Sequence, residues 1–305
     1  GEDRLRLLHA IASNTVEGLR PGQGTYSFFL SAQGRIQSDS RLFVAGDHVL
    51  LDCEPEARQT LLAHIESYII MDDVKMADLS ETTDAVALEG PQSDEIAAKA
   101  LGDVLPEPAE FSHRLSPLPF GDPDPPGPVS TPGPAAIHVL RCTLTGQPGL
   151  WLIVPRPSRE ALVARLEAAG AAAALPEDYR VVRVENGRPR FGEDYSSSNI
   201  PHETQQLQAV SFTKGCYLGQ EIVERVRSQG QVNKLLVSVE LDSVEPPPPG
   251  TIVLQGGREV GRLTSPVFSP RQGKVLAFAI LRREAAAEGS ALAAGSAQGR
   301  VRAIG

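Results

Sequence analysis

The chain is poor in cysteine and in aromatic residues. Phe, Trp and Tyr together make up only 5% of it. Three cysteines occur among 305 residues, namely Cys53, Cys142 and Cys216. Their number is odd, they are widely separated and no two form a CxxC pair, which argues against a disulfide framework and against a zinc ribbon. We therefore expect a protein of a reducing compartment, the cytoplasm.

Long apolar runs and a basic surface are missing as well. No apolar run approaches the ~20 residues that a membrane-spanning helix needs, and residues 1–6 do not resemble a signal peptide. Lys and Arg number 29 against 38 Asp and Glu, which gives a net charge of −9. A nucleic-acid ligand requires a basic face. We expect neither nucleic acid nor a membrane as a partner.

What the sequence does contain is typical of a folded protein of more than one unit. Hydrophobic residues make up 41% and charged residues 22% of a chain longer than one ordinary domain. Its first part alternates turns with the predicted strands 26–30, 35–44 and 49–51. Helical spacing then predicts a helix after Pro55, with Leu61 and Ile65 on its buried face, and a shorter helix from about Pro91.

A segment rich in proline interrupts the chain between residues 116 and 134. Proline removes a backbone donor and restricts the preceding residue, so this segment is predicted to be a linker or a surface loop. Strands are predicted beyond it at 136–144 and 150–154. A helix capped by Ser158 should follow, and then another strand at 179–184.

The last part of the chain contains short strand-like runs with glycine turns and no helix between them. These runs lie at 235–241, 251–254, 259–263 and 274–280. They predict a small antiparallel barrel. The Ala/Gly/Ser-rich residues 284–298 are expected to be mobile or weakly helical before a last strand at 300–304. We expect two domains, 1–233 and 234–305, with an α+β fold overall.

The densest chemistry lies in the octapeptide Lys-Gly-Cys-Tyr-Leu-Gly-Gln-Glu at residues 214–221. Two glycines flank a cysteine there, and Ile222, Val223 and Val226 follow at helical spacing. If Cys216 lies at the N-terminus of that helix beside Lys214, the helix dipole and the ammonium both favour its thiolate. The alternative is that this cysteine is merely a small residue in a crowded turn.

Other charged residues nearby allow two interpretations. Glu221, Glu224 and Arg225 belong to a functional surface or to a solvated helix face, which is the commoner use of such charges. His202 is a ligand or base, or a structural residue. Cys53 and Cys142 are expected to be buried packing residues.

The octapeptide resembles the signature of the YgfZ family, the folate-binding relatives of the aminomethyltransferase of glycine cleavage. The resemblance extends over nearly the whole chain, except for the proline-rich middle. It includes Asn14, the hairpin around Gly34, the segment from Arg183 to Gly192 and the run 261–266. The strand that precedes residue 1 in the family is absent, so we expect a truncated beginning.

This resemblance implies a GcvT-like cloverleaf of three subdomains, with a C-terminal antiparallel β-barrel, around a central hole that holds tetrahydrofolate or a one-carbon derivative. Glu185 matches the acid that binds the pterin ring, a task that suits a carboxylate because it accepts two neighbouring donors. Lys214 corresponds to a basic contact to folate, and Arg225 is a further candidate. Tyr195 or Phe191 is expected to stack on the ring.

The transferases carry a pair of acids after their first glycine-rich hairpin, where this chain has Ser38 and Asp39. Losing one carboxylate argues against ordinary glycine-cleavage chemistry, and Asp39 remains as a catalytic candidate. The resemblance therefore implies a folate-dependent factor for iron–sulfur cluster assembly or repair, with Cys216 as its key residue. Its partners would be the assembly machinery or client iron–sulfur enzymes. The alternatives are a folate-dependent aminomethyltransferase or demethylase, and an interaction module without folate affinity.

Overall fold

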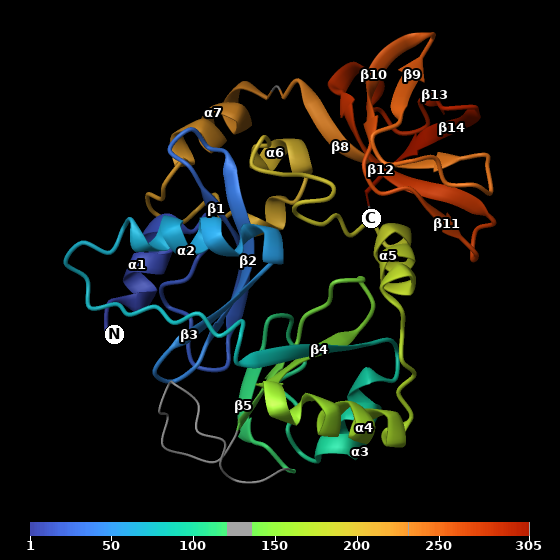
Figure 1. Cartoon of the computed structure of the whole chain (residues 1–305). Coiled ribbons are helices and arrows are strands. Elements are labelled where there is room, and N and C mark those ends of the chain that lie inside the picture. Colours follow the sequence, from blue (N-terminus) through green and yellow to red (C-terminus); the bar gives the residue numbers. More distant parts are fainter. Residues whose placement is uncertain (121–135, 231, 305) are drawn as a thin grey trace.

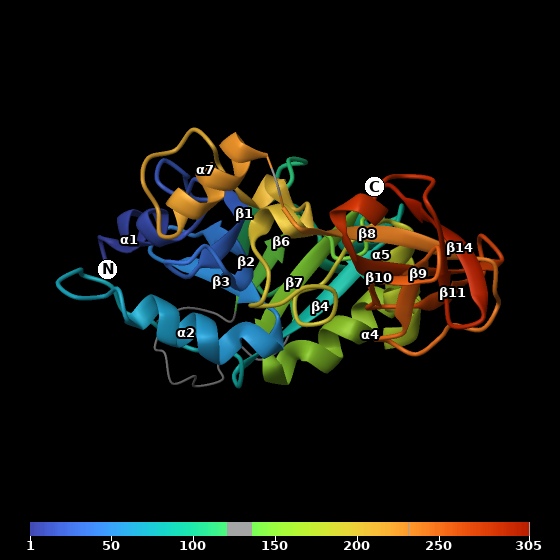
Figure 2. The same ribbon diagram turned by 90° about the horizontal axis from the view of Figure 1, so that it is seen from above.

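The computed structural model describes residues 1–120, 136–230 and 232–304. The chain forms three lobes, each built on its own antiparallel sheet, and the strand-rich third lobe lies at the opposite end from the N-terminus (Figures 1 and 2). This arrangement is the expected α+β cloverleaf with a C-terminal barrel. Within the described residues no helix is both long and apolar enough to cross a membrane.

The first lobe is a three-stranded sheet with the order β1-β2-β3 and helices beside it. Its elements are α1 (Arg4–Ile11), β1 (Gly24–Leu30), β2 (Ile36–Val44), β3 (Val49–Cys53), the 3₁₀ turn η1 (Pro55–Ala57) and α2 (Arg58–Glu66). The three strands and the helix after Pro55 agree with the sequence prediction. Leu61 and Ile65 of α2 are buried in one apolar cluster with Phe29 and Leu42 of the sheet.

The second lobe is a four-stranded sheet of order β4-β7-β6-β5 that packs against two helices. Its elements are β4 (Thr83–Glu89), α3 (Ser93–Leu101), β5 (His113–Pro117), β6 (Ala136–Leu140), β7 (Gly149–Pro155), η2 (Arg156–Ser158) and α4 (Arg159–Ala169). The predicted linker begins inside β5, an edge strand, where proline is tolerated. Most of that linker lies outside the described residues, because residues 121–135 are not described.

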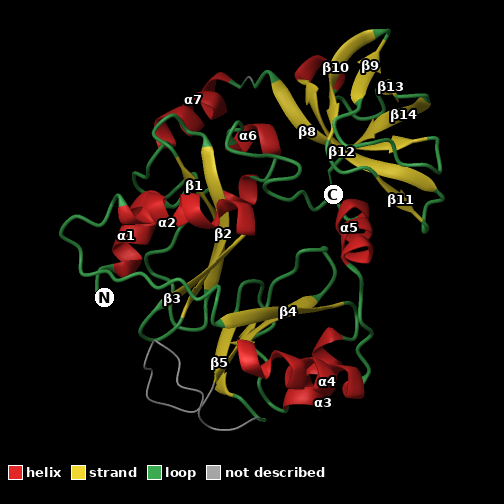
Figure 3. Ribbon diagram, in the orientation of Figure 1, coloured by secondary structure: helices red, strands yellow, loops and turns green. Residues whose placement is uncertain are grey.

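The third lobe is a closed barrel. Its sheet has the order β10-β9-β13-β14-β8-β12-β11, and an additional pairing of β10 with β12 closes six of these strands into a ring. The elements are β8 (Lys234–Leu241), β9 (Ile252–Gln255), β10 (Arg258–Leu263), β11 (Val267–Ser269), β12 (Lys274–Arg282), η4 (Arg283–Ala285), β13 (Ala291–Ala294) and β14 (Ala297–Arg302). Strands and loops make up almost all of this lobe in Figure 3.

The prediction for residues 284–298 is wrong. They contain β13 and the start of β14, which pair with each other across a turn at Gly295. Leu292 and Ala294 are buried in the barrel core, so neighbouring strands supply the stability that the small side chains lack on their own.

Four short elements connect the second lobe to the barrel: α5 (Pro176–Glu185), α6 (Pro201–Thr204), η3 (Leu207–Ala209) and α7 (Gln220–Gln229). The predicted strand at 179–184 is wrong, because these residues belong to α5. Pro176 occupies the first turn, and the Asp178 carboxylate accepts a hydrogen bond from the backbone N–H of Leu175 at 2.9 Å. These start signals outweigh the β-branched side chains that follow.

Candidate functional site

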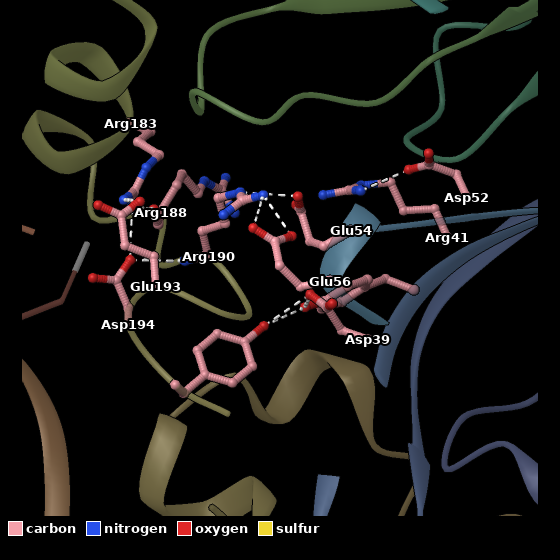
Figure 4. A network of polar contacts seen from close by, with 12 residues as sticks. Asp39, Arg41, Asp52, Glu54, Glu56, Arg183, Arg188, Arg190, Glu193 and Asp194 are labelled. Atoms are coloured by element: carbon pink, nitrogen blue, oxygen red, sulfur yellow. Dashed lines mark hydrogen bonds and ion pairs between the residues drawn. The ribbon is translucent and has the colours of Figure 1, made fainter. Parts of the chain in front are cut away.

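A buried carboxylate, Asp39 on β2, lies in the polar network of Figure 4. Its Oδ2 accepts hydrogen bonds from the phenols of Tyr26 at 2.7 Å and Tyr195 at 2.8 Å. Its Oδ1 is also buried and has no partner among the described residues. Burial and the neighbouring Asp39 raise the pKa of both tyrosines well above 10, so both phenols stay protonated and donate. The site therefore offers one unpaired acceptor to a ligand.

The neighbouring hydroxyl does not replace the second acid of the family's pair. Ser38 is fully buried, and its Oγ donates to the backbone carbonyl of Asp39 at 2.8 Å. Asp39 thus stands as the single carboxylate of this hairpin.

Tyr195 and Phe191 pack into the protein interior. Both are buried in one apolar cluster, and the Tyr195 ring lies nearly perpendicular to the rings of Phe28 and Phe191, at centroid distances of 6.3 and 5.7 Å. The hydroxyl of Tyr195, rather than its ring face, is what reaches the polar network.

Arg41, Glu54 and Arg190 extend this network, and sequence reasoning missed all three. The guanidinium of Arg41 donates to Asp52 at 2.8 Å and lies 5.6 Å from the ring centre of Trp151 on β7. Arg190 donates to Glu54 at 2.9 Å. Burial raises the pKa of Glu54 to about 7, although Arg190 opposes the shift. Nothing in the sequence alone distinguishes these charges from surface ones.

A second ion pair ties the loop after α5 to the barrel. Arg183, which is 1% exposed, donates to Asp194 at 2.7 Å. The other oxygen of Asp194 accepts hydrogen bonds from the hydroxyls of Thr264 at 2.6 Å and Ser265 at 2.5 Å. This network fixes the end of α5, where Glu185 lies, against the third lobe.

A cavity of about 300 Å³ lies between the end of α5 and the barrel. Its lining includes Glu185 and Asn186 from the helix end and Ser238 and Arg302 from the barrel. One oxygen of Glu185 accepts a hydrogen bond from the hydroxyl of Ser269 on β11. The volume is near the lower end of the range for small-molecule sites, about 300–1,000 Å³.

These residues offer hydrogen-bonding groups and a cation to a ligand. The carboxylate of Glu185 can accept hydrogen bonds from ring N–H groups, and the amide of Asn186 and the hydroxyl of Ser238 can donate or accept. The guanidinium of Arg302 offers a cation for a carboxylate. The lining thus contains a carboxylate, an amide, a hydroxyl and a guanidinium.

Lys214 is anchored to the first lobe. Its Nζ donates to the carbonyl oxygens of His9, of Ala12 at 2.7 Å and of Asn14 at 3.0 Å. Burial lowers the pKa of Lys214 to about 8, but three carbonyl acceptors match the three N–H donors of an ammonium. In the structure this lysine holds the octapeptide against the segment after α1.

Cys216 is the exposed cysteine of the three. Cys142 is buried as expected, whereas Cys53 is only partly buried. Burial raises the pKa of both thiols to about 12, which disfavours their reactive thiolate forms. The helix begins at Gln220 after Gly219, whose φ is +79°, so Cys216 lies in the turn that precedes α7. A Cβ on Gly219 would come within 2.6 Å of the Ser31 carbonyl oxygen. The glycine therefore lets the turn approach the first hairpin closely.

The remaining candidates lie apart from Asp39. Arg225 is exposed on α7 and pairs with Glu221 at 3.1 Å. His202 lies beside Phe212, with a ring-centroid distance of 6.2 Å, and burial lowers its pKa. The structure thus joins Asp39 with Tyr195, places Glu185 at the cavity and places Lys214 and Cys216 on the turn before α7. In the described part of the chain, no group of three His, Cys, Asp or Glu residues is arranged to hold a metal ion.

Comparisons with known proteins match both parts of this architecture. The model of the GCVT N-terminal domain matches residues 1–214, and the model of the glycine cleavage T-protein C-terminal barrel domain matches residues 234–304. The crystal structure of glycine cleavage system aminomethyltransferase T from Bartonella henselae superposes with a TM-score of 0.83 at 19% identity. It covers 99% of this chain and 81% of that chain.

Two curated relatives align over nearly the whole chain. A protein of Arabidopsis thaliana, provisionally named a chloroplastic transferase, is 25% identical over 297 residues, which are 97% of this chain and 65% of that protein. The aminomethyltransferase of Geobacillus kaustophilus is 27% identical over 299 residues, covering 95% of this chain and 77% of that enzyme. The chain thus spans about two thirds of the Arabidopsis protein and about three quarters of the enzyme.

Proposed function

Because the chain belongs to the GCVT family of the glycine cleavage T-protein, we propose that it binds a reduced folate in the cavity between α5 and the barrel. Glu185 accepts hydrogen bonds from the pterin N–H groups, and Arg302 attracts the glutamate carboxylate. When bound, tetrahydrofolate supplies a carrier for one-carbon units. In this proposal the chain's own residues orient the ring and hold its anionic end.

The proposal extends to the YgfZ branch of the family. The chain then assists the assembly or repair of iron–sulfur clusters in the cytoplasm, and Cys216 is its key side chain. One observation carries this: the octapeptide exposes its thiol, whereas Cys53 is partly buried and Cys142 is buried. A thiolate at the surface can ligate iron transiently, form a mixed disulfide or respond to oxidation. A stable cluster usually takes four thiolates, one more than the chain has.

Rescue of iron–sulfur enzyme activity in a strain that lacks the gene tests this proposal. Cys216→Ser should abolish rescue while the thermal unfolding curve stays unchanged, because the exposed side chain contributes little to packing. Cys53→Ser is the matched control, and it should rescue as the wild type does. Full rescue by Cys216→Ser would remove the thiol from the function.

A folate-dependent aminomethyltransferase or demethylase is the second candidate. The buried, unpaired Oδ1 of Asp39 favours it, since this oxygen could accept a hydrogen bond from a substrate amine. Incubation of the purified protein with tetrahydrofolate and glycine-derived or N-methyl amines distinguishes the two candidates. Turnover that Asp39→Asn abolishes and Cys216→Ser preserves would establish the transferase.

A further inference from the structure

The first and second lobes meet at a small apolar core of their own. Phe43 of β2 is buried there together with Leu140 and Ile153 of the second lobe. Leu50 of β3 and Trp151 of β7 pack against the same cluster. Trp151 is the single tryptophan of the chain, so its surroundings report on the contact between these two lobes.

His113, at the start of β5, is bonded twice to the first lobe at the edge of this core. The residue is 5% exposed. Its backbone N–H donates to the carbonyl oxygen of Gly22 at 2.8 Å, and its Nδ1 lies 3.4 Å from the carbonyl oxygen of Val44. A carbonyl oxygen only accepts, so Nδ1 carries the hydrogen of this bond. The neutral ring of His113 therefore has its lone pair on Nε2.

This lone pair faces a second histidine, His138 on β6. Nε2 of His113 and Nδ1 of His138 are 3.0 Å apart, and the two rings are nearly parallel, with an interplanar angle of 17°. His138 is the donor, and a hydrogen on both facing nitrogens would break the bond. His48, on the turn between β2 and β3, adds a third ring, whose centroid lies 5.6 Å from that of His138. The three rings thus connect the two lobes, and His113 and His138 are termed the histidine pair.

The charged groups around the rings offer little compensation for added protons. Asp47 accepts a hydrogen bond from His48 at 2.7 Å, but its side chain is 85% exposed, so water screens its charge. Arg4 of α1 reaches the same turn and adds a positive charge. Arg114 points to the other face of β5, and Ile153, which pairs with β6 at the histidine pair, is apolar. In the part of the chain that the structure describes, no carboxylate forms an ion pair with the histidine pair.

We propose that His48, His113 and His138 form an acid-sensitive contact, which holds the first lobe against the second at neutral pH and releases it when the imidazoles take up protons. Each added proton places a positive charge at the apolar core between the lobes. The expected change is an opening of this contact rather than unfolding, because each lobe has a separate apolar cluster of its own. The inference does not depend on the proposed folate site.

The direction of the response follows from proton binding. Burial lowers the pKa of His113, and burial together with the neighbouring His113 and His48 lowers the pKa of His138 to about 4. In an open contact an imidazole has its ordinary pKa of about 6.5. Between these values the open state binds more protons than the closed state, so acid favours opening. For His138 alone, a change from about pH 7 to about pH 4 multiplies the ratio of open to closed molecules on the order of 100-fold.

Fluorescence of the full chain from about pH 7.5 to about pH 4 tests the proposal, because Trp151 packs at the contact. The emission maximum of the wild type should move to longer wavelength as water reaches the indole, while the far-UV circular dichroism stays unchanged. His138→Gln, which has no titrating ring, should show no such transition in this range.

The control is His202→Gln, which removes a histidine of α6 whose pKa is also lowered by burial. It should keep the transition of the wild type. His48→Gln, at a partly exposed position, should move the midpoint of the transition about 0.5 pH unit lower, and it keeps the test decisive if His138→Gln does not fold. A wild type without a transition, a loss of circular dichroism in step with the fluorescence, or an unchanged midpoint in His48→Gln would overturn the proposal.

Discussion

Three carboxylates of this chain, those of Glu185, Asp39 and Glu54, lie in different surroundings and therefore differ in their chemical properties. Glu185 borders a cavity, Asp39 is buried with one oxygen that has no partner among the described residues, and Glu54 is half-buried beside an arginine. Glu185 is suited to bind a ligand, and the free oxygen of Asp39 is suited to accept a hydrogen bond. Partial burial raises the pKa of Glu54 to about 7.

Glu185→Ala should weaken tetrahydrofolate binding by more than about 1 kcal/mol, because the ring N–H groups lose their acceptor in the cavity. Titration calorimetry measures the effect. Glu221→Ala, at an exposed position of α7, is the control and should leave the affinity unchanged. Equal affinities for Glu185→Ala and the wild type would place the ring elsewhere.

Glu54→Gln should change how stability depends on pH. The pKa of Glu54 is about 7 in the folded protein and about 4.3 in an unfolded chain, so between these values the native state binds the extra proton. The free energy of unfolding contributed by this group therefore falls as pH rises through that window. The free energy of unfolding of Glu54→Gln, measured relative to that of the wild type, should therefore rise by on the order of 2 kcal/mol as the pH is raised from about 5 to about 8.

Urea denaturation across this pH range measures the difference. Glu56→Gln, which removes a half-exposed partner of the same Arg190, should give a nearly pH-independent difference from the wild type. A pH-independent difference for Glu54→Gln as well would show that Glu54 titrates normally.

Among the elements, the strands of the first lobe and barrel were predictable because their alternation and turns are local signals. The α5 helix was not, since Tyr179, Val181, Val182 and Val184 are typical of a strand. The start signals of that helix, Pro176 and Asp178, precede the run. The residues of β13 and the first residues of β14 have no strand signal of their own, and the sheet that receives them is formed by distant parts of the chain.

Of the candidate site residues, only those that belong to a recognisable sequence motif could be predicted. The octapeptide indicated Cys216, and the resemblance indicated Glu185 and Asp39. The network residues Arg41, Glu54 and Arg190 could not be predicted. Glu54 and Arg190, for example, are in contact although they lie far apart in the sequence, and no local pattern reveals such a contact. The prediction of a cysteine at the helix N-terminus was approximate, because α7 begins after Gly219.

The attachment of the α5 end to the barrel depends on Arg183. Arg183→Met should lower the free energy of unfolding by about 3–5 kcal/mol, because the fully buried Asp194 carboxylate would lose its cation. Arg180→Gln, which removes a more exposed partner of Glu193, should cost less than about 1 kcal/mol. Guanidinium denaturation compares the two, and equal small losses would mean that the buried pair does not stabilise the contact.

At the scale of the whole molecule, the candidate site residues are distributed over the three lobes. The first lobe contributes Asp39 and, through its contacts with Lys214, holds the turn that presents Cys216. The end of α5, which follows the second lobe, and the barrel of the third lobe line the cavity. Under the proposed function, a folate bound there would contact both α5 and the barrel, whereas Cys216 lies on the turn before α7.

The most direct measurement is a crystal structure of the chain soaked with tetrahydrofolate. The account predicts the pterin ring between α5 and the barrel, with its N–H edge on Glu185 and its glutamate directed toward Arg302. A ring bound at Asp39 instead, or a cavity that stays filled with water at saturating folate, would contradict it.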